Sequence, residues 1–347
     1  MVWENYPANY REKEIQVILR AVRSGECVSV IGLSGSGKSN LMGFLANRVE
    51  PPPHFLFLDC NRMLDISPTG FWKFIARQMG ETELALEALE AVDLRLEKWF
   101  SDHDSLCWVV DRFDRLPGEL QMQLAGQLRA FRDQYKYQLT YVIAGRCALD
   151  AESEIAELFF ANTLWLGPLT SENARWSMAA YASRRQGSLD ESTMQAIAAV
   201  SGRYPAFLRA CCEAVMDGCA PEVEALRQHP AVARRLKEFW SDRPTPDALK
   251  NSGLEDVPLL SEMTEAEPAP PDDSRLTASE ARLLKVLQAQ PGKVIEKDAL
   301  IQQVWPEERA VDGLRDDSLA QLVRRLRKKV GEERIETIPG RGYRWRG

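Results

Sequence analysis

The stretch Gly32-Leu33-Ser34-Gly35-Ser36-Gly37-Lys38-Ser39 follows an apolar, β-branched run at 27–31. It fits the pattern G-x-x-x-x-G-K-[ST], in which a tight glycine-rich loop lets backbone N–H groups surround a phosphate. In such a loop Lys38 reaches the β- and γ-phosphates as a point charge, and the Ser39 hydroxyl ligates Mg²⁺. The other contacts are expected from Gly32, Gly35, Ser36 and Gly37. We therefore predict a site for ATP with Mg²⁺, with an ordinary glycine loop as the alternative.

Charge is distributed unevenly along the 347 residues, whose net charge is −7. Residues 275–347 carry 16 Lys and Arg against 11 Asp and Glu, whereas residues 1–274 carry 28 against 40. This asymmetry indicates a basic binding module attached to an acidic body. No signal-peptide pattern and no long uncharged apolar run is found, so we expect a cytoplasmic protein without a membrane partner.

Short apolar runs alternate with amphipathic stretches in the first half of the chain, which is typical of a parallel α/β sheet. We expect strands at 27–31, 55–59, 106–111, 139–145 and 163–166. From 169 to 240 the pattern is helical, with a turn at 202–205. Residues 241–274 hold six prolines and nine acidic against two basic residues, which is typical of an extended linker.

The predicted organisation has four parts. These are an α/β nucleotide-binding domain at 1–167, a helical lid at 168–240, a flexible linker at 241–274 and a DNA-binding domain at 275–347.

Asp111 ends the apolar run 106–111, where a carboxylate would hold Mg²⁺ through water. With the phosphate loop and the strand number, this resembles the P-loop ATPases that include the AAA+ and STAND families, over about residues 8 to 240. The resemblance places an acidic, water-activating residue after Asp111, but the chain has Arg112, which stays protonated and cannot act as a base. We expect slow hydrolysis at most, with Asp114 as the next available carboxylate.

The resemblance implies three further site residues. Arg146, at the end of the fourth strand, resembles the STAND arginine that senses the γ-phosphate, and a structural arginine is the alternative. Arg11, in a Tyr-Arg-Glu segment, resembles the residue beside the adenine, although a plain helix start also fits. Pro205, in Gly-Arg-Tyr-Pro, resembles the Gly-x-Pro motif of the lid, with an ordinary interhelical turn as the alternative.

Residues 276–345 resemble the winged helix-turn-helix domain of OmpR/PhoB-type response regulators. We expect helices at 276–287, 294–305 and 317–330, followed by a hairpin, the wing, at 335–345. The third helix has one apolar face and a basic surface, as suits the DNA major groove, unless it is a solvated face of a protein-binding helix. The expected DNA contacts are Ser318, Gln321, Arg324, Arg325, Lys328 and, on the wing, Arg341.

Together these features predict an ATP-binding, nucleotide-switched transcriptional regulator. We expect ATP to set its lid position or its oligomeric state, so that a homo-oligomer pairs several DNA-binding domains. A sensor protein in trans is a further expected partner. The alternative is an AAA+ ATPase acting on DNA, similar to origin initiators or to transposition or defence ATPases. A third hypothesis makes the winged helix a protein-binding module.

Overall fold

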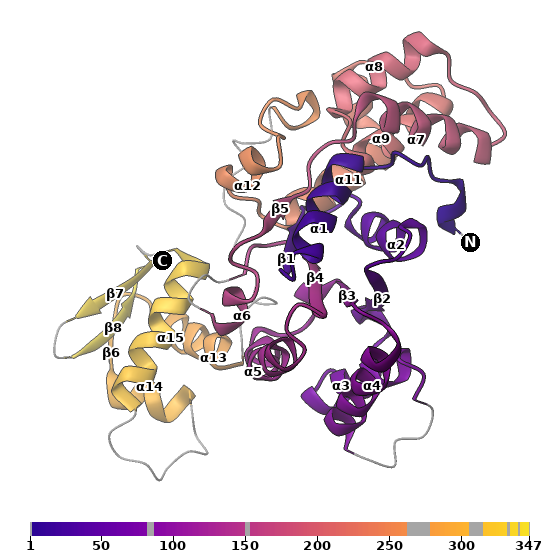
Figure 1. Ribbon diagram of the computed structural model, residues 1–347. Helices are drawn as coiled ribbons and strands as arrows, with labels where there is room; N and C mark the ends of the chain where they lie inside the picture. The colour runs from indigo at the N-terminus through magenta and orange to yellow at the C-terminus, as the bar shows by residue number, and fades with distance from the viewer. Residues whose placement is uncertain are drawn as a thin grey trace. The chain divides into compact units, whose positions relative to one another are not determined.

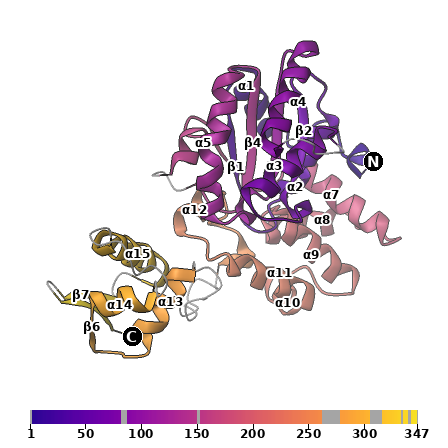
Figure 2. The same ribbon diagram turned by 90° about the horizontal axis from the view of Figure 1, so that it is seen from below.

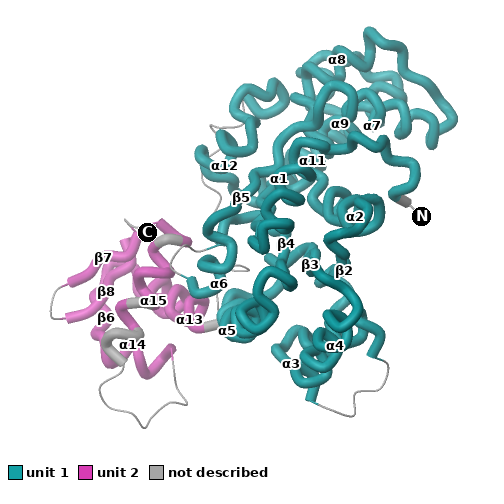
Figure 3. Tube along the Cα trace, in the orientation of Figure 1, with its two compact units in different colours: residues 1–264 teal, residues 265–347 magenta. Residues whose placement is uncertain are grey.

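The computed structural model describes residues 2–81, 87–149, 153–261, 278–304, 315–331, 334–338 and 341–346. At positions 2, 278, 315–318, 321 and 328 it describes the backbone alone. The chain divides into two compact units, Met1–Thr264 (unit 1) and Glu265–Gly347 (unit 2), which Figure 3 colours separately. Each unit is described by itself.

A parallel sheet in the order β2-β3-β4-β1-β5 forms the centre of unit 1. Its strands are β1 Val28–Ile31, β2 His54–Asp59, β3 Leu106–Asp111, β4 Leu139–Gly145 and β5 Thr163–Trp165. The predicted five-stranded parallel sheet is thereby confirmed, with strand ends within one residue of expectation. Because β1 lies between β4 and β5, the loop after β1 emerges at the carboxyl edge of the sheet between two neighbouring strands, and open α/β sheets bind ligands at this edge.

Helices cover both faces of the sheet (Figures 1 and 2). Alternate residues of the strands belong to two different apolar cores. On β3, Cys107 and Val109 pack with α1 (Glu12–Arg23) and α2 (Lys38–Arg48). Trp108 and Val110 face the opposite way. They pack with α3 (Pro68–Gln78), α4 (Ala88–Asp102) and α5 (Gly118–Gln134). Both faces are buried, which explains the continuous apolar runs of the sequence.

Beyond the sheet, a short helix α6 (Glu154–Glu157) precedes β5, and a group of helices follows β5. We call this group the lid, after the sequence prediction for the same residues. The lid comprises α7 Ser171–Arg184, α8 Glu191–Ser201, α9 Pro205–Met216, α10 Val223–Gln228 and α11 Pro230–Ser241. Phe207, Cys211 and Phe239 of the lid belong to the same apolar core as α1 and α2. The lid therefore shares one packed interior with the sheet of unit 1.

The expected linker at 241–274 is wrong over its first part. Residues 246–251 form helix α12 (Pro246–Asn251), and a 3-10 turn follows at Pro258–Leu260. Leu254, Leu259 and Leu260 are buried in the core of the lid. A few apolar residues at suitable spacing are sufficient to anchor this segment. The high content of proline and acidic residues had led to the prediction of a linker. The rest of the expected linker, from 262 onward, lies outside the described residues.

Unit 2 is a small α+β domain with its own core. Helices α13 (Ala278–Gln288), α14 (Lys297–Val304) and α15 (Arg315–Val330) pack on an antiparallel sheet in the order β6-β8-β7. Its strands are β6 Val294–Glu296, β7 Ile335–Ile338 and β8 Gly342–Trp345. The expected second helix at 294–305 is therefore wrong at its start, because residues 294–296 pair with β8 before the helix begins. The expected hairpin is the pair β7 and β8.

Candidate nucleotide site and nucleic-acid interface

The phosphate loop connects β1 to α2 at the carboxyl edge of the sheet. Gly35 and Gly37 have φ angles of 84° and 89°, which glycine tolerates and other residues adopt only with strain. Gly37 caps α2, whose first residue is Lys38, so the unpaired amides and positive dipole end of the helix face the loop. The predicted residues Gly32, Gly35, Ser36, Gly37, Lys38 and Ser39 thus lie together on this loop and at the start of α2, and a helix N-terminus of this kind suits an anion.

Lys38 turns back onto its own loop. Its ammonium donates hydrogen bonds to the carbonyl oxygens of Gly32 and of Leu33, the latter at 3.3 Å. Burial lowers the pKa of Lys38 from 10.5 to about 8, and the carboxylates of Asp114 and Asp242 partly oppose this shift. A buried cation held by carbonyl dipoles is ready to exchange them for phosphate oxygens.

Asp111 ends β3 beside the loop and is 1% exposed. Burial raises the pKa of its carboxyl, while a hydrogen bond from Ser39 opposes the rise. Its Oδ1 atom is buried and has no hydrogen-bond partner among the described residues. An unsatisfied carboxylate oxygen beside a serine hydroxyl is a donor set that suits a hard divalent cation.

Arg112 follows Asp111 in a left-handed conformation, with a φ angle of 58°. Its Nε lies 3.7 Å from Asp111 Oδ2 and 3.9 Å from Asp59 Oδ1. The guanidinium thus neutralises carboxylates at the ends of two adjacent strands. Such a group cannot remove a proton from water.

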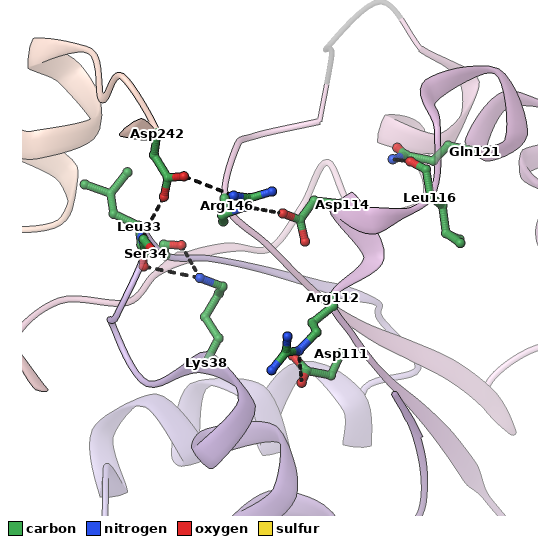
Figure 4. Close-up of polar contacts among 11 residues, drawn as sticks. Leu33, Ser34, Lys38, Asp111, Arg112, Asp114, Leu116, Gln121, Arg146 and Asp242 are labelled. Atoms are coloured by element: carbon green, nitrogen blue, oxygen red, sulfur yellow. Dashed lines mark hydrogen bonds and ion pairs between the residues drawn. The ribbon is translucent and has the colours of Figure 1, made fainter. Parts of the chain in front are cut away.

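Arg146 follows β4 and bridges two acids from distant parts of the chain (Figure 4). Its Nε lies 2.6 Å from Asp114 Oδ2, and its Nη1 lies 3.0 Å from Asp242 Oδ1. These contacts, with that to Asp114 strongest, raise the pKa of Arg146. The other oxygen of Asp242 accepts a hydrogen bond of 2.9 Å from the backbone N–H of Ser34, inside the phosphate loop. Arg146 and the loop are therefore linked through one carboxylate.

The lid rests directly on the phosphate loop at the start of α9. The Tyr204 hydroxyl donates to the Ser34 carbonyl at 2.8 Å, and the Ala206 N–H donates to the Gly35 carbonyl at 3.1 Å. A Cβ atom on Gly37 would lie 3.6 Å from Pro205 Cγ, so Pro205 packs near the loop. The sequence predicts Pro205 as a lid residue of the site, and this stays a prediction. Tyr204 was not among the predicted site residues, because a buried tyrosine before a helix has no distinctive pattern.

Arg11, expected beside the adenine, is 1% exposed and bound to protein groups. Its Nη2 donates to the carbonyls of Ser36 at 2.8 Å and Gly167 at 3.0 Å, and its Nη1 pairs with Glu14 at 2.8 Å. Its backbone N–H donates to the Asn173 side chain at 2.8 Å. Arg11 thus ties the phosphate loop to α1 and to the start of the lid.

In unit 2, the basic residues of α15 divide into two groups. Arg324 and Arg325 are exposed. Arg327 instead bonds the Ile335 carbonyl at 2.9 Å and the Thr337 hydroxyl at 2.6 Å, so it attaches the helix to β7. Lys329 pairs at 2.5 Å with Glu280, which is buried on α13. Arg327 and Lys329 therefore hold α15 against the rest of the domain.

The remaining predicted contacts are placed only in part. Arg341 is exposed and directly precedes β8, at the turn of the hairpin. Ser318, Gln321 and Lys328 lie on α15, but their side chains are outside what the structure describes. Arg341, Arg324 and Arg325 are the described candidates for DNA contact.

Two family models match the chain, one in each unit. Residues 20–149 match an AAA domain, and residues 272–345 match the C-terminal domain of transcriptional regulatory proteins. The latter region is 39% identical over 74 residues to the transcriptional regulatory protein CseB of Streptomyces coelicolor, and 38% identical to that of Streptomyces avermitilis. Each match covers 20% of this chain and 28% of the relative, so the likeness is confined to one domain.

Solved structures also align with the chain. The Aeropyrum pernix ORC1 protein in complex with DNA aligns over 96% of this chain and 88% of its own, with 13% identity and a TM-score of 0.43. A Walker-type ATPase of Pyrococcus abyssi aligns over 96% and 92%, with 14% identity and a TM-score of 0.47. No helix in the described part of the chain is long and apolar enough to cross a membrane. The chain thus joins an AAA domain to a C-terminal domain of the transcriptional regulatory protein family.

Proposed function

We propose that this protein is a DNA-binding transcriptional regulator controlled by ATP. Lys38 and the loop amides would hold the phosphates, the lid would respond to them, and unit 2 would bind DNA. The observation that carries the proposal is the pair of hydrogen bonds from Tyr204 and Ala206 to the phosphate loop. A ligand that changes the conformation of the loop must also change these two contacts between the loop and the lid.

Mg²⁺ fits the residues beside the loop. The unpartnered Oδ1 of Asp111 and the hydroxyl of Ser39 would hold it, directly or through water, as oxygen ligands. The ion would neutralise charge on the phosphates. Its main role in this proposal is to stabilise bound nucleotide.

Slow turnover fits the surroundings of Asp111. Arg112 contacts that carboxylate, and Asp114, the other candidate base, is engaged by Arg146. Because Asp114 Oδ2 already accepts a hydrogen bond from Arg146, that oxygen is engaged by the protein and not by an attacking water. We therefore propose that the protein is a switch that retains its nucleotide and hydrolyses it slowly. The alternative, a DNA-stimulated ATPase, predicts rapid turnover.

DNA binding in unit 2 would use Arg324, Arg325 and Arg341, which are exposed. Because one domain of this size makes a small DNA interface, pairing of several copies in a homo-oligomer would raise the avidity. A sensor protein in trans would supply the upstream input.

The test is retention of genomic DNA fragments by the full-length protein, with and without a non-hydrolysable ATP analogue and Mg²⁺. We expect selective retention that requires the analogue and that Lys38→Ala abolishes. Lys98→Ala, at an exposed position on α4, is the matched control and should behave as wild type. Equal retention of DNA with and without nucleotide would overturn the proposal of an ATP-controlled switch. Rapid DNA-stimulated ATP hydrolysis would favour the alternative of an ATPase that acts on DNA.

A further inference from the structure

Asp242 directly follows the last residue of α11 and places a buried carboxylate in the nucleotide site. Its side chain is 6% exposed. A carboxylate at the C-terminal end of a helix meets the negative end of the helix dipole, and burial adds a desolvation cost. Its position is therefore unfavourable unless strong partners compensate.

Those partners are the groups that would otherwise receive phosphate. One oxygen accepts the Ser34 N–H at 2.9 Å, and the other pairs with Arg146 at 3.0 Å. The charge of Asp242 also acts on Lys38, where it partly opposes the lowering of the pKa by burial. A single carboxylate thus bonds a loop amide and Arg146, and its charge also acts on Lys38 (Figure 4).

Asp242 and a terminal phosphate cannot use these partners together. The Ser34 N–H offers one hydrogen, and two anions at hydrogen-bonding distance from it would repel each other. A phosphate that binds there must expel the carboxylate, and the end of α11 would lose its attachment to the loop.

We propose that Asp242 is an internal phosphate mimic that latches the lid onto the empty nucleotide site and is displaced by the terminal phosphate of a nucleoside triphosphate. The inference rests on the proposed function, because it assumes that the loop amides, the Ser34 N–H included, receive the phosphates; it adds Arg146 as a contact of the terminal phosphate. A diphosphate, which lacks the terminal group, leaves the latch in place. The device therefore makes the lid distinguish the two nucleotides.

The first test compares nucleotide affinities of the full-length protein, using fluorescent ADP and a fluorescent non-hydrolysable ATP analogue with Mg²⁺. Asp242→Asn keeps the shape and the acceptor oxygen but removes the competing charge. We expect its Kd for the triphosphate to fall about tenfold, as the loss of one charged hydrogen bond would give, and that for ADP to fall less than about threefold. Glu238→Gln, on the same helix but paired with Arg235, is the matched control and should change neither.

The outcomes separate the two proposals. If the wild type binds neither nucleotide, the proposed function fails and the latch fails with it. If the wild type binds both nucleotides, the latch alone is wrong in any of three cases. These are that Asp242→Asn weakens binding of the ATP analogue, leaves its Kd unchanged, or strengthens binding of both nucleotides equally.

A second measurement needs no variant at position 242. Hydrogen–deuterium exchange of the wild-type protein should show protection at residues 33–37 and 239–244 without nucleotide. The ATP analogue should speed exchange at 239–244, ADP should not, and Lys38→Ala should show no response. Slower exchange at 239–244 with the ATP analogue would contradict displacement of the latch.

Discussion

Raising the pH should weaken nucleotide binding by discharging Lys38. Its pKa is lowered from 10.5 to about 8, chiefly by burial. The carboxylates of Asp114, Asp242 and Asp111 oppose the shift, and Arg146 adds to it. Lys38, the proposed phosphate-binding cation, therefore loses its charge at a pH far below that of an exposed lysine.

The size of the effect follows from that pKa. With a pKa of about 8, Lys38 is about 90% protonated near pH 7 and about 10% near pH 9. If only the ammonium binds phosphate, the Kd for the ATP analogue rises about tenfold over this range, or about 1.4 kcal/mol.

Destabilisation of the fold by deprotonation of Lys38 cannot explain this loss of affinity for the ATP analogue. Because its folded pKa lies below its unfolded value, the native state binds fewer protons, and the Lys38 contribution to stability rises with pH between about 8 and 10.5. Burial also raises the pKa of Tyr10, beside the loop, to about 12, so this tyrosine stays neutral. Binding and stability should therefore change in opposite directions.

Calorimetric titration of the full-length protein with the analogue, in two buffers of different ionisation enthalpy, measures both the Kd and proton uptake. We expect net uptake of protons on binding above about pH 8. Lys38→Arg should have a flat profile, since a guanidinium stays charged throughout. A wild-type profile as flat as that of Lys38→Arg, or an equal pH slope in both proteins, would refute the reasoning.

Other predictions concern the lid and unit 2. Tyr204→Phe should lower the free energy of unfolding of unit 1 by about 1 kcal/mol, because it removes the hydrogen bond to the loop, whereas Tyr137→Phe, at a residue 69% exposed, should be neutral in calorimetric melting. Glu280→Gln should destabilise unit 2 by about 2 kcal/mol through its buried ion pair to α15, and an unchanged melting transition would contradict this. Arg324→Ala should reduce the salt dependence of DNA binding by about one ion if it contacts phosphate, measured by fluorescence anisotropy. Arg327→Ala should instead loosen α15 from β7, so a melting temperature equal to wild type would be unexpected.

Local pattern was sufficient for the sheet and the phosphate loop. The apolar runs that end at Ile31 and Asp111, and the glycine spacing between 32 and 37, encode strand, turn and helix start within a few residues. Each of these features depends on neighbours in the chain, so the sequence alone was enough to place them. The basic helix and hairpin of unit 2 were recognisable for the same reason.

Contacts between distant segments depended on the tertiary structure. Composition assigned Asp242 to a linker, yet it bonds Ser34, 208 residues away, and Tyr204 bonds the same residue across 170. On α15, sequence alone could not distinguish Arg327, which holds the wing, from Arg324, which is exposed. Amino-acid sequence specifies side-chain chemistry, but packing decides which charges meet, and therefore which residues hold the lid on the phosphate loop.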